Sequence, residues 1–148
     1  MSRQPSRLTL DNTGFLLAKA SQRWNELLHE RFAAAGFPEV RPAYGSLLIP
    51  LYEEDGMRQG ELARRARLSK QTLTTMARAL ERDGLITRRP DPTDARATLL
   101  FLTERAQELR PVAERVLAEL DAAVAAELPA RSRASLNTAL RRIADIER

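Results

Sequence analysis

Side chains that can hydrogen-bond to nucleic-acid bases or phosphates are concentrated near the middle of the 148-residue chain. Hydroxyl, amide, ammonium and guanidinium groups read base edges in a major groove, or hold the phosphate oxygens beside it. No acidic residue interrupts this set before Glu81. An ordinary solvated polar helix face is the alternative, and this stretch alone does not separate the two interpretations. The candidates for DNA contact are Ser69, Lys70, Gln71, Thr72, Thr74, Thr75 and Arg78.

Two further basic candidates, Arg88 and Arg96, lie in a predicted hairpin. The segments LITRR and TLLFLT favour strands, and PDPTDARA between them is too polar to bury. A narrow minor groove attracts arginine because negative potential is concentrated there. We expect Asp91 and Asp94 to act inside the loop, capping it and orienting an arginine by a charge-assisted hydrogen bond. A surface hairpin with balanced charge is the alternative.

The positive charge of the chain comes from the same segment. Residues 57–105 contain eleven Lys or Arg and six Asp or Glu, whereas the remaining residues contain thirteen and fourteen. This segment therefore supplies the whole net charge of +4. A basic face confined to one module is the electrostatic pattern expected for nucleic-acid binding.

The elements that position these side chains are predicted from apolar spacing. Two short amphipathic helices are expected, the second with a stripe at i, i+3, i+4 and i+7. Ser69 is a good N-cap, so the second helix should begin near Lys70. It should end near Gly84, because only glycine enters the left-handed region without steric cost. With the hairpin, the predicted fold class is mainly α with a small β-hairpin wing, a winged helix-turn-helix. The stripe consists of Leu73, Met76, Ala77 and Leu80.

Long amphipathic helices are predicted on both sides of this module. A helix of about 25 residues is about 37 Å long, so its apolar stripe exceeds what a small core covers. We expect a second copy of the chain to cover these stripes in a two-fold dimer. A monomer that folds its helices back on themselves is the alternative. The predicted organisation is a single domain over residues 1–148, with a DNA-binding region over 40–103 and helical dimerisation regions over 8–36 and 104–148.

Two prolines lie inside predicted helices. Pro50 falls in a helix expected from Pro42 to about Glu53, and Pro111 falls in a helix that starts near Glu104. Proline removes a backbone donor and clashes with the preceding turn, so a kink or a break is expected at both. The inward residues of the first of these helices would be Tyr44, Leu47, Leu48 and Leu51.

Residues 57–104 resemble the DNA-binding domain of the MarR family of bacterial transcriptional regulators. The resemblance rests on GELARRARLSKQTLTTMARALERDGLITR and on DPTDARATLLFLT, whose Asp94, Arg96 and Leu102-Thr103 match the wing signature of the family. It implies that Arg96 enters the minor groove, that Asp94 orients it, and that residues 70–78 form the major-groove face. It also implies a homodimer that binds a pseudo-palindromic operator, as a repressor that a ligand releases.

The resemblance further implies a site for a small effector, often an aromatic acid or a phenol, between the dimer helices and the DNA-binding module. Trp24 is alternatively a core aromatic, and His29 a solvent-facing histidine. The sequence names no effector. The candidate ligand-binding residues are Trp24, His29, Tyr44 and Tyr52.

The composition argues against several other classes of protein. The chain is 43% apolar and 30% charged, which is typical of a globular protein, and without cysteine it forms no disulfide or zinc finger. With one histidine and no glycine-rich phosphate loop, neither an enzyme nor a bound metal or cofactor is expected. The sequence lacks a signal peptide or an apolar run of about 20 residues, so a cytoplasmic protein without a membrane partner is expected. The remaining alternatives are a non-specific chromosome-associated DNA-binding protein and a winged-helix module for protein interaction.

Overall fold

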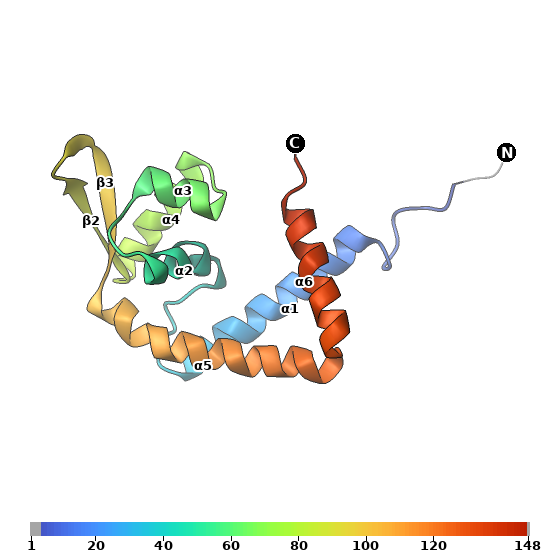
Figure 1. Ribbon diagram of the computed structural model, residues 1–148. Helices are drawn as coiled ribbons and strands as arrows, with labels where there is room; N and C mark the ends of the chain where they lie inside the picture. Colours follow the sequence, from blue (N-terminus) through green and yellow to red (C-terminus); the bar gives the residue numbers. More distant parts are fainter. Residues whose placement is uncertain (1–3, 148) are drawn as a thin grey trace. The chain divides into compact units, whose positions relative to one another are not determined.

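The computed structural model describes residues 4–147, which form a mainly helical protein with one small sheet (Figure 1). The chain comprises two compact units, one up to Ala113 and one from Glu114 onward, with the boundary inside α5. The elements in order are α1 (Thr13–Ala34), the 3-10 turn η1 (Pro42–Tyr44), α2 (Gly45–Glu53), β1 (Met57–Arg58), α3 (Gln59–Ala66), α4 (Lys70–Arg82), β2 (Ile86–Asp91), β3 (Asp94–Leu102), α5 (Glu104–Glu127) and α6 (Ala130–Ala144).

Helix α1 begins where Asn12 caps it. The Asn12 side-chain oxygen accepts hydrogen bonds from the backbone amides of Gly14 at 3.0 Å and Phe15 at 3.3 Å. These amides belong to the first turn, whose donors have no partner inside the helix. The helix ends before Gly36, which has a φ of +93°. The predicted helix between Asp11 and Ala35 is therefore confirmed to within two residues.

Helices α3 and α4 form the predicted helix-turn-helix. Arg67 adopts the left-handed conformation, with a φ of +54°, in the turn between them. The Ser69 hydroxyl oxygen accepts a hydrogen bond from the Thr72 amide at 3.1 Å, so α4 begins at Lys70 as predicted. Gly84 follows the helix with a φ of +76°, again as predicted. The buried residues on these two helices are Leu62, Ala63, Leu73, Ala77 and Leu80.

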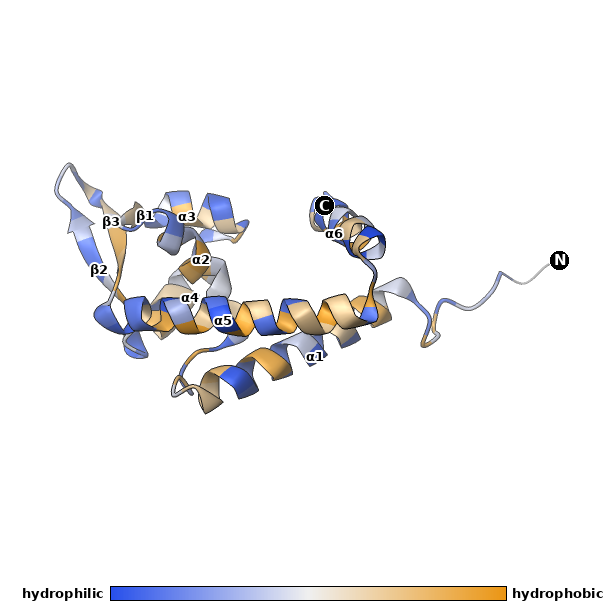
Figure 2. Cartoon of the chain, turned by 60° about the horizontal axis from the view of Figure 1, so that its bottom comes forward, coloured by the Kyte–Doolittle hydropathy of each residue, from blue (hydrophilic) through white to orange (hydrophobic). Residues whose placement is uncertain are grey.

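The sheet has three antiparallel strands in the order β1-β3-β2, whereas the sequence predicted only the β2–β3 hairpin. In the added strand, Met57 pairs with Leu100 and Arg58 pairs with Leu99. A strand of two residues has no period that a sequence pattern could show. Figure 2 shows that β2 is hydrophilic and that the end of β3 nearest α5 is hydrophobic. This hydrophobic end includes Leu100, which is fully buried.

The wing hairpin has a shorter turn than its sequence predicted. The segment 90–97 was expected to form a loop, but only Pro92 and Thr93 separate β2 from β3. Pro90 lies within β2 opposite Thr98, beside an irregularity in the strand register. Proline is tolerated at such irregularities and at sheet edges, and β2 is an edge strand.

Neither internal proline ends its helix, so of the predicted kink or break the break is wrong at both positions, and the kink stays a prediction. Helix α2 continues past Pro50, and α5 continues past Pro111. Each proline removes one backbone hydrogen bond, but buried neighbours hold the helix on either side. Tertiary packing therefore outweighs the local preference. These buried neighbours are Leu47, Leu48 and Leu51 in α2, and Ala106, Leu109, Val116 and Leu120 in α5.

Helix α6 differs from the others because none of its residues is buried. Its apolar side chains at Leu136, Leu140 and Ile143 are 38–41% exposed. They follow the helical spacing of a single stripe. Within residues 4–147, no helix combines the length and the apolar character required to cross a membrane.

Candidate DNA interface

Helix α4 presents a polar face opposite its buried stripe. Leu73, Ala77 and Leu80 are fully buried, whereas Lys70 and Arg78 are exposed. The exposed face contains no carboxylate before Glu81, so it offers hydrogen-bond donors and positive charge without local compensation. Of the predicted DNA-contacting residues, those exposed at the start and along the face of α4 are Ser69, Lys70, Gln71, Thr72, Thr75 and Arg78.

The hydroxyl groups at the start of α4 already make hydrogen bonds within the helix. The Ser69 hydroxyl donates to Thr72 Oγ1 at 2.9 Å, and the Thr75 hydroxyl donates to the Gln71 carbonyl at 3.1 Å. Thr74 differs because it is half-buried, donates to the Lys70 carbonyl at 2.8 Å and accepts from Gln59 Nε2 at 2.8 Å. A hydroxyl has one proton to donate, so Ser69, Thr74 and Thr75 all have their donor in use, and Thr74 also has an acceptor position occupied by Gln59.

Arg96 is the most exposed of the predicted contact residues in the wing. Its side chain is 95% exposed, and its Nε lies 3.8 Å from Asp94 Oδ1. The same carboxylate oxygen accepts a hydrogen bond from the Arg96 backbone amide at 3.0 Å. Asp94 thus fixes the backbone of Arg96 more closely than its guanidinium group. The guanidinium projects into solvent from the edge of the wing.

Arg88 occupies a different environment at the base of the wing. Its guanidinium donates two hydrogen bonds to the Glu81 carboxylate at the end of α4, at 3.2 and 3.1 Å. The hydrogen bond from Arg88 holds the pKa of Glu81 below its usual value. A bidentate pair of this kind fixes the orientation of the arginine. Arg88 therefore joins β2 to α4, and its contact with DNA remains a prediction.

Asp91 is almost fully buried in the turn of the wing, with 6% of its side chain exposed. Its Oδ1 accepts from the Thr93 amide at 2.8 Å and from the Thr93 hydroxyl at 2.7 Å, while Oδ2 pairs with Arg58 Nε at 2.8 Å. The backbone hydrogen bond from Thr93 is the main reason that the pKa of Asp91 is lowered. The prediction that Asp91 caps the loop and holds an arginine is confirmed. The sequence did not indicate which arginine it holds.

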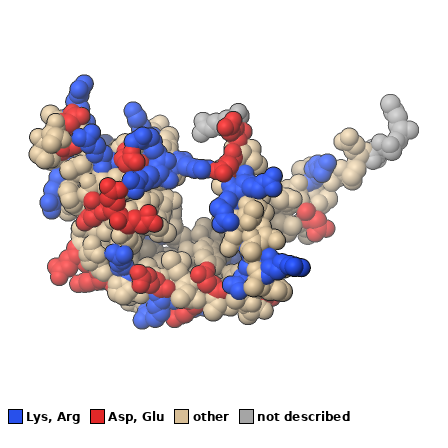
Figure 3. Space-filling view, in the orientation of Figure 1, with Lys and Arg blue, Asp and Glu red and all other residues tan. Residues whose placement is uncertain are grey.

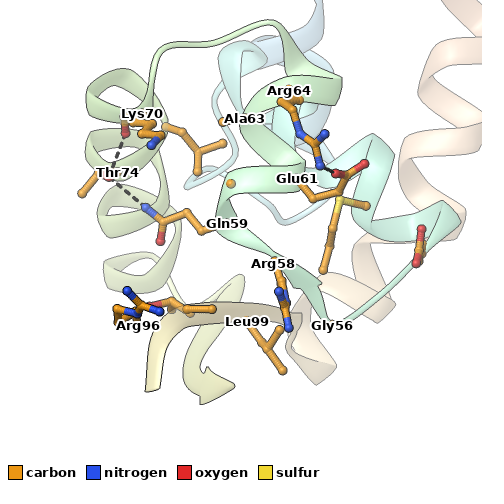
Figure 4. A pocket seen from close by; sticks show the side chains of 16 residues that line it. Gly56, Arg58, Gln59, Glu61, Ala63, Arg64, Lys70, Thr74, Arg96 and Leu99 are labelled. Carbon is orange, nitrogen blue, oxygen red and sulfur yellow. Dashed lines mark hydrogen bonds and ion pairs between the residues drawn. The ribbon is translucent and has the colours of Figure 1, made fainter. Parts of the chain in front are cut away.

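A cleft of about 940 Å³ separates the wing from the first turns of α4. Figure 4 shows Lys70 and Thr74 on one side of this cleft, Arg96 and Leu99 on another, and Gln59 between them. In Figure 3, Lys and Arg side chains lie over the wing tip and over the helix-turn-helix along the same edge. The cleft thus has DNA-contact candidates from both elements along its walls.

Comparison with known proteins agrees with this geometry. Residues 42–98 match the sequence model of the MarR family. The fold is similar to that of the PcaV transcriptional regulator from Streptomyces coelicolor in complex with its natural ligand, with a TM-score of 0.80 and 25% identity, covering 95% of this chain and 98% of PcaV. Residues 42–98 therefore carry a winged helix-turn-helix of the MarR type. The predicted fold class, mainly α with a wing, is thereby confirmed.

Two other similar proteins are informative. The transcriptional repressor CouR, bound to a 23-mer DNA duplex, is 27% identical with a TM-score of 0.76, covering 94% of this chain and 99% of CouR. The uncharacterized HTH-type transcriptional regulator YdgJ of Bacillus subtilis (strain 168) is 34% identical over 85 residues. That alignment covers 55% of this chain and spans about half of YdgJ, at 52%. The MarR match and these relatives support a DNA-binding transcriptional regulator, and proteins of this family are generally not enzymes.

The four residues predicted to bind an effector lie in different environments. Trp24 is half-buried and His29 is exposed, whereas Tyr44 is buried. The Tyr44 hydroxyl donates to Asp83 Oδ2 at 2.5 Å, and the Tyr52 hydroxyl donates to the Ala106 carbonyl at 2.6 Å. Burial raises the pKa of Tyr52 to about 12. Both tyrosine hydroxyls therefore make hydrogen bonds inside the fold. A shallow groove along α1 is lined by His29 but not by the other three residues.

Sequence reasoning missed Arg105, which joins the start of α5 to the segment after α1. Arg105 Nε lies 2.8 Å from Glu39 Oε1, and its Nη2 donates to the Gly36 carbonyl at 2.6 Å. The guanidinium also lies over the Phe37 ring, 3.8 Å from its centre. The hydrogen bond from Arg105 lowers the pKa of Glu39. These contacts join residues almost 70 positions apart, so no local pattern could have predicted them.

Proposed function

We propose that the protein is a homodimeric regulator that binds a pseudo-palindromic operator and represses transcription until a small aromatic or phenolic ligand releases it. The proposal rests on two exposed surfaces that border the same cleft. The exposed face of α4 is free of carboxylates up to Glu81, and Arg96 extends from the wing with 95% of its side chain exposed. Lys70 of that face and Arg96 line the same cleft.

The two surfaces suit different parts of a DNA duplex. The N-terminal end of the second helix of a helix-turn-helix enters the major groove, where Gln71, Thr75 and Arg78 would meet base edges. An arginine at the end of a wing suits the narrow minor groove, where negative potential is concentrated. Arg96 therefore provides affinity for many sequences, while the α4 face provides the preference among them.

A dimer accounts for the apolar side chains that each unit leaves exposed. In α6 these are Leu136, Leu140 and Ile143, and in α1 they include Phe15 and Leu16, which are 38% and 51% exposed. Burial of such side chains against a second copy removes apolar area from water. A two-fold axis then presents two copies of α4 about 34 Å apart, one helical turn of DNA.

Repression and ligand release are supported by the relatives rather than by a site in this chain. CouR is described as a repressor and is bound to DNA, and PcaV is bound to its natural ligand. We place the effector near Trp24, His29, Tyr44 and Tyr52, which lie on α1, η1 and α2. A ligand that binds better to a conformation with the wrong spacing of α4 helices would lower DNA affinity by its difference in affinity for the two states.

The test is a selection of genomic fragments by the purified protein, followed by binding measurements at several salt concentrations. A sequence-specific dimer should prefer one palindromic fragment by about 10³-fold or more over random DNA. Arg96→Ala should weaken binding to every fragment and reduce the salt slope by about 1. Thr75→Ala or Arg78→Ala should instead change the base preference, by about 1–3 kcal/mol per direct contact.

Arg115→Ala is the matched control, because it removes an exposed arginine from α5, outside the proposed interface. It should bind DNA as the parent does. If the interface variants also bind every fragment as tightly as the parent, the assignment of these residues is wrong. A protein that coats chromosomes would show no sequence preference, and a protein-interaction module would show no salt-dependent binding to DNA.

A further inference from the structure

Two adjacent residues, Arg58 and Gln59, contact the two elements that line the cleft. Arg58 ends β1 and Gln59 begins α3. The side chain of Arg58 reaches the turn of the wing. The side chain of Gln59 reaches Thr74 of α4 (Figure 4). One point of the backbone is therefore linked to both DNA-facing elements.

The Arg58 side chain holds the turn of the wing through a carboxylate that is almost fully buried. Its Nε lies 2.8 Å from Asp91 Oδ2, and its Nη2 donates to Thr93 Oγ1 at 3.3 Å. Asp91 Oδ1 in turn accepts from the amide and the hydroxyl of Thr93. The conformation of residues 91–93 thus depends on the pairing of Asp91 with Arg58. Arg96 follows this turn in β3.

The Gln59 side chain holds the first turns of α4. Its Nε2 donates to Thr74 Oγ1 at 2.8 Å, and Thr74 donates to the Lys70 carbonyl at 2.8 Å. Gln59 and Thr74 are both half-buried, so water competes less strongly for this contact than at the open surface. The contact fixes α4 beside the start of α3, near the residues proposed to enter the major groove.

The backbone between the two side chains is itself well held. Arg58 pairs with Leu99 in the sheet, and Leu62 and Ala63 in the next turn of α3 are buried. We propose that Arg58 and Gln59 form a spacing clamp, a pair of positioning residues that fixes the distance between the wing and α4 and so sets DNA affinity without contacting bases. This inference rests on the proposed DNA-binding function.

Direct binding of Arg58 to a phosphate is the competing explanation. A variant of Asp91 distinguishes the two explanations. If Arg58 acts on DNA directly, Asp91→Asn removes a negative charge near the phosphates and should leave affinity unchanged or higher. If Arg58 acts through the wing, Asp91→Asn releases the turn and should weaken binding as Arg58→Ala does. Because the two explanations predict different effects of Asp91→Asn on DNA affinity, this variant decides between them.

The experiment measures operator affinity for Arg58→Ala, Asp91→Asn and the double variant. A side chain that acts through a second element changes binding by roughly 3- to 30-fold, and we expect each single variant to lose affinity in this range. The double variant should lose no more than either single variant, because one contact is removed twice. Arg58→Lys should recover part of the loss, since lysine can still pair with Asp91. Losses that multiply in the double variant, or an undiminished affinity in Asp91→Asn, would overturn the clamp.

Arg65→Ala is the matched control for lost charge, because Arg65 pairs with Glu54 and Glu61 and is 41% exposed, against 53% for Arg58. It should bind the operator within about twofold of the parent. If it loses as much affinity as Arg58→Ala, the effect belongs to net charge and the clamp is refuted.

A measurement without DNA separates failure of the clamp from failure of the proposed function. In the free protein, Arg58→Ala should speed hydrogen exchange at the Thr93 amide, which Asp91 accepts, and leave the core amide of Leu73 unchanged. Gln59→Ala should leave Thr93 exchange unchanged but still weaken operator binding, because it releases α4 instead of the wing. A parent protein without selective DNA binding would contradict the proposed function, while unchanged Thr93 exchange in Arg58→Ala would contradict the clamp.

Discussion

Helices α4 and α6 carry similar apolar stripes but bury them to different extents. Leu73, Ala77 and Leu80 in α4 are completely buried within the helix-turn-helix unit. Leu136 and Leu140 in α6 are 40% and 41% exposed, and no residue of α6 is buried. Both stripes follow the same helical period.

The comparison shows that a period identifies an apolar face but not the partner of that face. The stripe of α4 meets residues of its own unit, so it stabilises the fold of a single chain. The stripe of α6 keeps apolar area in contact with water, which is unfavourable unless another surface covers it. Variants in the two stripes should therefore affect different properties, folding for α4 and association for α6.

Leu73→Ala should have the largest effect, because it removes three side-chain carbon atoms from a fully buried site and leaves only a methyl group. We expect the free energy of unfolding to fall by about 2–5 kcal/mol. Denaturant-induced unfolding measures this change. Gln71→Ala, on the exposed face of the same helix, is the control and should unfold like the parent. A similar stability for both variants would mean that the α4 stripe is not the core of the unit.

Leu140→Ala should mainly weaken the dimer. The side chain is already partly buried in one chain, so the dimer should lose about 1–2 kcal/mol, a roughly 5- to 30-fold higher dissociation constant. Sedimentation equilibrium measures this constant. Asn137→Ala lies on α6 but outside the stripe and is the control. A parent protein that sediments as a monomer at every concentration would remove the proposed distinction between the two stripes.

Two glycines test the backbone of the unit that contains α4. Gly84 has a φ of +76°, and Gly60 lies within α3, but an added Cβ would meet no atom within 4 Å at either. Gly84→Ala should lower the free energy of unfolding by about 1–2 kcal/mol, because the left-handed region is costly for alanine. Gly60→Ala should raise it by up to about 1 kcal/mol, because alanine favours the helix. Calorimetric melting of both variants shows whether each raises or lowers the stability. A change in the same direction for both would contradict this account of Gly84 after α4.

The pairing of Glu39 with Arg105 should give the smallest effect, visible as a dependence on pH. The hydrogen bond from Arg105 lowers the pKa of Glu39 below its ordinary value of 4.5. A lowered carboxyl pKa stabilises the fold above the unfolded value, and this contribution is lost as the pH falls through the folded pKa. The stability difference between the parent and Glu39→Gln should therefore be largest near neutral pH and shrink below about pH 4.5. Urea unfolding across this range measures it, and a difference that grows on acidification would be inconsistent with the pair.

The parts of the fold that the sequence predicted are those with local signals. Ser69 and Gly84 mark the ends of α4, and each acts on backbone within a few residues of itself. The strand β1 was not predicted, and the sequence left open whether the helix continues past Pro111. The first is too short to show a period, and the second depends on packing that the local sequence does not describe.

The candidate site was predictable in its composition but not in its connections. The sequence identified both Arg96 and Arg88 as basic candidates, but one projects into solvent and the other pairs with Glu81. It also predicted that Asp91 holds an arginine, but Arg58 is 33 positions away, so the partner was not apparent. Pairing over such distances depends on the register of β1 with β3.

The junction between the wing and α5 is a single residue, Thr103. Its amide donates to the Leu85 carbonyl at 3.1 Å, and its hydroxyl donates to the Gly84 carbonyl at 2.7 Å. Because a single residue separates α5 from β3, a rotation of the first turns of α5 should be passed directly to β3. We therefore expect the hairpin and the first turns of α5 to move together, about the hydrogen bonds that Thr103 makes to Gly84 and Leu85.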